Sequence, residues 1–412
     1  MNNRQGDDFV MENLDRAFAN VSWFEAHPHS IVRNLPILCA DHGPIILDTD
    51  CRPPFKPRPF RFEWMWTTHP DCDSLIHESW STTTRLGSHA FCLKSKTDRM
   101  KEKFKIWNKT TFGQVEREIE QQTNQLKQIQ KKIQSIEDVL IEKILRDNLE
   151  NLLHKEQVIW AQKAKKDWDL KGDRNTRFFQ IVIRNRRKRN QIVQLKNDDN
   201  SWVLEPKQIE DCITHFFHNL YSRPQSLDPD ILPQLSNVHI PTITTFQAAQ
   251  LEQPVLEVEI FQAFHQMGPL KTSGPDGIPA AFYQKYWNTV HTDITNMVKA
   301  FFHSGFILKS LNHTFITLSP KIPTPKKISQ FRPISLYNVT YKIISKILIN
   351  RLKPLMDTLI TPFQNDFIQG HQITDNIILA HEIFEFLKRK KKGRWGFGAL
   401  KLDMNKVYDR IN

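Results

Sequence analysis

One carboxylate in this sequence stands where metal-assisted phosphoryl chemistry would need it. Asp403 directly follows an apolar run at residues 397–402, and Tyr408 lies five residues further along the chain. Nucleotide transfer uses two divalent ions, and Mg²⁺ prefers carboxylate and water oxygens, so an Asp at the end of an apolar strand suits this chemistry. The Tyr408 ring would lie near the nucleotide sugar, where it can exclude a 2′-hydroxyl. Taken alone, these residues more often mark a strand that ends at a solvent-exposed Asp.

A basic element lies upstream, at residues 315–336. Two apolar runs, at 315–321 and 331–336, flank a proline-stiffened loop that contains Lys326 and Lys327. The pattern predicts two strands joined by a finger that folds over a triphosphate, to which Lys321 supplies a point charge and Arg332 a planar fork of donors. An exposed basic hairpin without this role fits the sequence about equally well.

Two loops complete the pattern. Residues 274–277, Gly-Pro-Asp-Gly, predict a tight turn in which Gly supplies a positive φ and Pro fixes its own φ, so a structural role is favoured over catalysis. Residues 367–376 lead from a loop into a helix, and they fit either a contact with a template backbone or an ordinary capped helix start.

The order of these motifs is more specific than any one of them. The G-P-D-G turn, S-P-K, F-R-P-I-S-L, G-H-Q-I-T-D-N and K-L-D-M-N-K-V-Y-D-R follow one another over about 140 residues. This run resembles the fingers and early palm of LINE-type non-LTR retrotransposon reverse transcriptases. The resemblance implies RNA-templated addition of dNTPs to a primer 3′-end, with Mg²⁺ bound by Asp403. It also implies selection of deoxynucleotides by Tyr408 and triphosphate contacts from Lys321 and Arg332.

The resemblance extends to the N-terminal half. Residues 171–179 and 190–192 are similar to the basic connector between endonuclease and polymerase in such polyproteins. Residues 2–4, 14–16 and 41–44 are similar to the last part of an apurinic-type endonuclease. In that family Asp41 would orient His42, and His42 would act as general base or stabilise the scissile phosphate. The Asp-His pair without its flanking matches would describe an ordinary turn.

The elements that position these residues divide the chain into four segments. We expect an α+β fold: a remnant of a β-rich endonuclease/exonuclease/phosphatase-type domain at 1–60, a basic helical connector at 61–221, a Pro-rich linker at 222–254, and reverse transcriptase fingers with the start of the palm at 255–412. Apolar residues at heptad spacing predict a coiled-coil-like seam at 115–140, in a long helix or a helical hairpin. The final strand is expected at 397–403, and helices are expected near 257–267, 279–303, 338–359 and 374–391.

Charge supports a polyanionic partner. The 412 residues carry a net charge of +12, and residues 94–190 contain 25 Lys and Arg against 14 Asp and Glu. Such an excess favours contacts with nucleic-acid phosphates, and a solvated basic surface is the alternative. The densest cluster comprises Arg184, Arg186, Arg187, Lys188 and Arg189. The expected partners are an RNA template, a DNA primer or target, and dNTPs.

Other features concern the cellular setting. Five scattered cysteines without a C-x-x-C pair favour a reducing compartment, and no signal peptide or long apolar segment is visible. We therefore expect an intracellular protein, nuclear or cytoplasmic, without a membrane segment. The sequence leaves its oligomeric state open, and a coiled-coil scaffold is the weakest of the functional alternatives.

Departures from the family pattern bear on activity. The family's Tyr-x-Asp-Asp element does not occur in the 412 residues, and Val407 replaces a usual Ala beside Tyr408. We expect a truncated copy that is inactive alone because one acidic strand cannot hold both ions. The alternative is a catalytically dead relic that binds nucleic acid through its connector and fingers.

Overall fold

The computed structural model describes most of the chain. The described residues are 17–27, 29–34, 45–51, 57, 59–82, 87–112, 115–131, 135–164, 176–197, 199, 201–222, 241–361, 364–365, 368, 370–390 and 396–400. The chain forms two compact units: Met1–Pro59 with Val193–Glu210, and Phe60–Ile192 with Asp211–Asn412. Each is described by itself below.

The first unit contains two antiparallel strand pairs. After the short helix α1 (Val21–Ala26), β1 (Ile31–Asn34) pairs with β2 (Ile45–Asp48), so that Ile31 lies opposite Asp48. A second pair is formed by β3 (Leu195–Lys196) and β4 (Trp202–Val203). Strands were expected at these positions near the N-terminus, and their assignment to an endonuclease remnant stays a prediction.

The second unit is mostly helical. Its described elements are, in chain order, η2 (Trp64–Thr68), α2 (Pro70–Ser81), α3 (His89–Trp107), the π-helical turn η3 (Asn108–Phe112), α4 (Val115–Gln130), α5 (Ile136–Ala164), α6 (Thr176–Asn190), α9 (Thr245–Leu251), α10 (Glu257–His265), α11 (Ala280–Lys285), α12 (Trp287–Ser304), α13 (Lys309–Asn312), β5 (Phe315–Pro320), η6 (Ile328–Gln330), β6 (Phe331–Leu336), α14 (Val339–Leu352), η7 (Lys353–Leu355), α15 (Met356–Leu359) and α16 (Ile373–Arg389). The helix α7 (Pro206–Tyr221) begins in the first unit and ends in the second.

One hydrophobic core joins the segment from Phe62 to Trp107 to the segment from Val255 to Ile347. Phe62 lies at its centre, with its ring centroid 5.5 Å from that of Phe104 and 5.2 Å from that of Phe282. The Trp66 ring stacks on Phe104 at 5.0 Å. Buried aromatic pairs of this kind dominate core energetics. The packing therefore unites residues that the sequence analysis placed in two separate segments.

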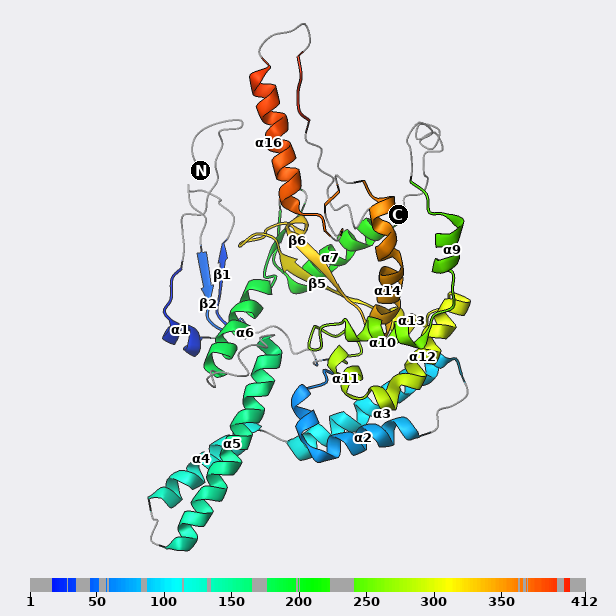
Figure 1. Cartoon of the computed structure of the whole chain (residues 1–412). Coiled ribbons are helices and arrows are strands. Elements are labelled where there is room, and N and C mark those ends of the chain that lie inside the picture. Colours follow the sequence, from blue (N-terminus) through cyan, green and yellow to red (C-terminus); the bar gives the residue numbers. More distant parts are fainter. Residues whose placement is uncertain are drawn as a thin grey trace. The chain divides into compact units, whose positions relative to one another are not determined.

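The heptad-containing region forms a helical hairpin, one of the two arrangements expected. α4 and α5 contact each other along the chain and lie side by side in Figure 1. Leu126 and Ile129 of α4 are half-buried, whereas Ile136 and Leu140 of α5 are 83% and 56% exposed. The apolar repeat therefore does not continue as one packed seam, because the chain turns between Gln130 and Ile136.

Three expected elements differ in the structure. The helix expected at 279–303 is divided into α11 and α12 at Tyr286, whose hydroxyl donates a 2.7 Å hydrogen bond to the Asp73 carboxylate. The helix expected at 338–359 ends at Leu352, because Pro354 lacks the N–H that would continue it. Residues 397–400, the described part of the strand expected at 397–403, are not in a strand, and no described segment pairs with them.

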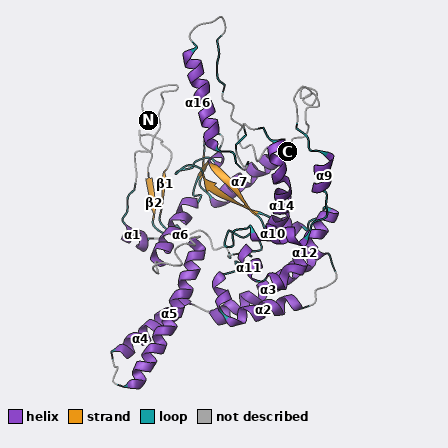
Figure 2. Cartoon of the chain, in the orientation of Figure 1, coloured by secondary structure: helices purple, strands orange, loops and turns teal. Residues whose placement is uncertain are grey.

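The architecture belongs to the α+β class that the sequence predicted. Figure 2 shows many helices and a few short strands, and the strands described form three two-stranded antiparallel sheets. Among the described helices, none is both long and apolar enough to cross a membrane.

Candidate nucleotide and nucleic-acid interface

The β5–β6 hairpin brings together four of the predicted site residues. Its strands pair from Phe315 opposite Leu336 to Pro320 opposite Phe331. Where the strands part, the Lys321 backbone N–H donates to the Gln330 carbonyl at 2.8 Å. The Gln330 side-chain oxygen accepts hydrogen bonds from the backbone N–H groups of Lys326, at 2.6 Å, and Lys327, at 3.1 Å. One glutamine therefore closes the loop and holds the lysine-bearing backbone in place.

The hairpin is uniformly cationic. Arg332 lies opposite Ser319 in the register, and its side chain is exposed, as are those of Lys321 and Lys326. Residues 314–338 contain no Asp or Glu. Since no acid of the hairpin itself competes for these cations, the hairpin can attract phosphate groups.

The hairpin ends at a buried asparagine. Asn338 is 2% exposed, and its side-chain oxygen accepts a 3.0 Å hydrogen bond from the Asp276 backbone N–H. Its amide nitrogen donates to the carbonyl oxygens of Leu311, at 3.3 Å, and Ser310, at 3.5 Å. One side chain therefore links the residues before β5, the residues after β6 and the Gly274–Gly277 turn.

The turn has no room for side chains at its glycines. The Gly277 N–H donates to the Gly274 carbonyl at 3.1 Å, which closes the turn. A Cβ at Gly274 would collide with the backbone of Tyr337 and Asn338. Gly277 has a φ of 75°, and a Cβ there would collide with the Phe60 carbonyl. The structural role predicted for this motif agrees with these contacts.

Residues distant in the sequence form further hydrogen bonds with the turn and with the residue Thr272 that precedes it. The Arg61 guanidinium donates to the Gly274 carbonyl at 2.6 Å, and the Phe62 N–H donates to the Gly277 carbonyl at 2.9 Å. The Lys342 ammonium donates to the Thr272 carbonyl at 3.0 Å. The sequence analysis missed Asn338, Arg61 and Lys342. Only Asn338 carried a signal, because it lies two residues after the F-R-P-I-S-L motif.

The Asp276 carboxyl is the titratable group at this junction. Burial raises its pKa to about 6, although a 3.0 Å hydrogen bond from the Ile278 N–H and the charges of Lys101, Arg61 and Lys342 oppose the shift. The residue as a whole is half-buried, but protein atoms surround the carboxyl group itself. Desolvation therefore outweighs three neighbouring cations.

The predicted basic cluster lies on α6, which is attached to α5. Phe179 and Ile183 are buried against Ala161 and Ala164. Arg186 donates to the carbonyl oxygens of Lys163, at 2.5 Å, and Ala164, at 3.4 Å, and so satisfies the C-terminal end of α5. This contact gives Arg186 a structural role, and its binding of nucleic acid stays a prediction.

The other cations of α6 differ in exposure. Arg187 and Arg189 are exposed, and Arg184 is half-buried. Partial burial and the nearby charge of Arg184 lower the pKa of Lys188. α6 also contacts β5. Arg187 and Arg189 are therefore the members of the cluster most accessible to a nucleic acid.

Four predicted site residues lie outside the described residues. These are Asp403 and Tyr408 near the C-terminus, and Asp41 and His42 near the N-terminus. Among the described residues, no group of three or more His, Cys, Asp or Glu could hold a metal ion. The predicted roles of these four residues therefore stay predictions.

Asp276→Asn tests the electrostatic cost of the junction. The pKa of Asp276 is higher in the folded chain than in the unfolded chain. The free energy of unfolding that protonation of Asp276 contributes is therefore complete below about pH 4 and is lost as the pH rises through 6. At pH 7.5 we expect Asp276→Asn to be more stable than the native chain by up to about 3 kcal/mol, because the amide avoids burial of a charge.

The advantage of Asp276→Asn should shrink as the pH falls to 4.5, which denaturant unfolding at several pH values measures. Asp357→Asn, an exposed position in α15, is the matched control and should show no such trend. A difference between Asp276→Asn and the native chain that does not change with pH would contradict the account.

Comparison with known proteins gives two partial matches. Residues 324–412 match the family described as reverse transcriptase (RNA-dependent DNA polymerase), and this range includes Lys326, Lys327 and Arg332. The chain is also 30% identical over 240 residues to the Transposon TX1 uncharacterized 149 kDa protein of Xenopus laevis. That match covers 58% of this chain and 18% of the relative. Both matches support the predicted resemblance to a LINE-type non-LTR retrotransposon polyprotein with a reverse transcriptase domain.

Proposed function

We propose that the chain supplies the connector, fingers and early palm of an RNA-directed DNA polymerase that extends a DNA primer on an RNA template. The observation that carries this proposal is the β5–β6 hairpin, where Lys321, Lys326, Lys327 and Arg332 are presented without an acidic neighbour in the same segment. Three of these cations fall within the reverse transcriptase match. The match spans 18% of the length of the relative. The activity of a whole polyprotein is therefore part of this proposal.

The hairpin would bind the triphosphate of the incoming dNTP. Arg332 can form two parallel hydrogen bonds to phosphate oxygens, and Lys321 adds a point charge where the strands part. Asn338 and the Gly274–Gly277 turn would keep the hairpin in a fixed position. Preorganised cations of this kind stabilise charge without moving during the reaction.

Metal binding is proposed from the sequence alone. Asp403 would be one Mg²⁺ ligand, and Tyr408 would contact the nucleotide sugar. When bound, Mg²⁺ would stabilise charge on the transferred phosphoryl group. The described residues include no group of three or more His, Cys, Asp or Glu that could hold a metal ion. Cleavage chemistry at Asp41 and His42 is likewise proposed from the family resemblance alone.

A second candidate function is nucleic-acid binding without catalysis. One observation favours it: α6 presents exposed arginines and contacts β5 of the cationic hairpin. Both candidate functions require binding of RNA, and only the first requires incorporation of nucleotides.

Primer extension separates the two candidates. The 412-residue chain and a C-terminally extended version that includes a Tyr-x-Asp-Asp element are incubated with an RNA template, a DNA primer, dNTPs and Mg²⁺. We expect incorporation by the extended version and loss of about 10³-fold or more in Asp403→Asn, because a metal ligand is removed.

Within the same extended protein, Arg332→Ala should raise KM for dNTP about tenfold, the equivalent of one charge-assisted hydrogen bond. Ser335→Ala, on the same strand, is the control. Absence of incorporation by both the 412-residue chain and the extended version would refute the polymerase and leave the binding function.

RNA binding at several salt concentrations tests the basic surface. Neutralising one phosphate contact on a single strand lowers the salt slope by about 0.7, so the double variant Arg187→Ala with Arg189→Ala should flatten the slope by about 1.4 and weaken binding uniformly across sequences. Asn185→Ala, an exposed position on α6, serves as the control. An unchanged slope in the double variant would exclude α6 from the interface.

A further inference from the structure

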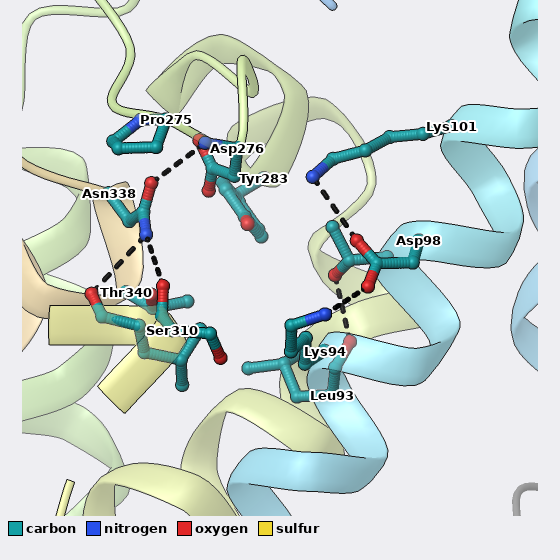
Figure 3. A pocket seen from close by; sticks show the side chains of 12 residues that line it. Leu93, Lys94, Asp98, Lys101, Pro275, Asp276, Tyr283, Ser310, Asn338 and Thr340 are labelled. Carbon is teal, nitrogen blue, oxygen red and sulfur yellow. Dashed lines mark hydrogen bonds and ion pairs between the residues drawn. The ribbon is translucent and has the colours of Figure 1, made fainter. Parts of the chain in front are cut away.

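A cavity of about 200 Å³ lies beside the Gly274–Gly277 turn, within the second unit. Figure 3 shows α3 on one side, with Asp98 and Lys101, and the turn with Asp276 and the Tyr283 ring on the other. Ser310 and Asn338, which flank the hairpin, complete the wall. One water needs roughly 10–15 Å³ of such space, so the cavity has room for a polyatomic ligand.

Two hydroxyl groups in the cavity wall have no hydrogen-bond partner among the described residues. Thr340 is 3% exposed, and its Oγ1 is buried without a partner. The Ser310 Oγ is likewise buried without a hydrogen-bond partner. Both residues line the cavity. A buried hydroxyl that makes no hydrogen bond is costly, so two of them in one cavity wall indicate a polar occupant.

The charges around the cavity favour an anion. On α3, Lys94 and Lys101 both pair with Asp98, and the Lys101–Asp98 distance is 3.3 Å. Three ionisable groups of one helix face therefore contribute a net charge of +1 to the wall. A metal cation would be repelled by the two ammonium groups, and the described residues include no cluster of metal ligands.

The opposite wall adds to this balance. This wall contains the Asp276 carboxyl group, and the positive charges of Arg61 and Lys342 lower the pKa of that group. Taken together, the surroundings hold four cations and two carboxyl groups. A ligand with negative charge and several acceptor oxygens matches both this excess and the unpartnered hydroxyls.

We propose that the cavity is a binding site for a tetrahedral oxyanion, a phosphate group, held by the Lys101 ammonium and the hydroxyls of Ser310 and Thr340. Such a ligand would join α3 to the residues on both sides of the hairpin. It would therefore stabilise the folded chain by an amount that grows with the logarithm of its concentration above Kd. The phosphate belongs either to the free ion or to a nucleotide, and the proposal is independent of polymerase activity.

The test compares inorganic phosphate with chloride at matched ionic strength, using the full 412-residue chain. Thermal unfolding should shift upward in phosphate, and isothermal titration should report binding. Thr340→Val keeps the shape of the side chain and removes the hydroxyl. We expect it to weaken phosphate binding about five- to tenfold, while its unfolding midpoint in chloride is unchanged or raised, because an unpartnered polar group has been removed.

Lys101→Met should abolish the phosphate-dependent shift, and Lys299→Met, an exposed lysine of α12, should leave it intact. A nucleoside monophosphate titrated in parallel separates the two sources: tighter binding than inorganic phosphate assigns the site to a nucleotide, and equal or weaker binding assigns it to the free ion. The proposal is overturned if phosphate gives no shift beyond chloride, or if Thr340→Val and the native chain bind phosphate equally.

Discussion

The position of the β5–β6 hairpin depends on the side chain of Asn338. This one amide accepts from the Asp276 N–H and donates to the carbonyls of Ser310 and Leu311. The approach is so close that only glycine fits at position 274. Because the three partner groups are backbone atoms in a buried place, loss of the amide would leave several of them unsatisfied, each at a cost of about 1–3 kcal/mol.

This junction explains why an upstream segment belongs to the same compact unit as the β5–β6 hairpin. Arg61 and Phe62 hydrogen-bond the turn, and Phe62 also lies at the centre of the aromatic core. The segment that contains Arg61 and Phe62 therefore helps to hold the hairpin in place. Within the same unit, α6 carries exposed arginines and contacts β5. The proposed phosphate-binding functions thus rest on elements that share one framework.

The sequence predicted local elements well and their tertiary partners poorly. The strands at 315–320 and 331–336 and the helix at 373–389 agree closely with the expected positions, since alternation, Pro and helical periodicity are local signals. The sequence analysis missed the break at Tyr286, whose hydroxyl donates a hydrogen bond to Asp73, more than 200 residues away. The heptad pattern indicated a hairpin but also implied burial of Ile136, which is exposed. For the site, motif order found the cations, whereas nothing local marked Arg61.

Hydrogen exchange in Asn338→Ala tests most directly whether this amide holds the hairpin. Asn312→Ala, an exposed position at the end of α13, is the matched control. The account predicts that the amides of Asp276 and of the β5–β6 pair exchange at least about tenfold faster in Asn338→Ala, equivalent to about 1.4 kcal/mol, while those of the α4–α5 hairpin keep their native rates. Native exchange rates at the turn and the hairpin in Asn338→Ala would contradict it.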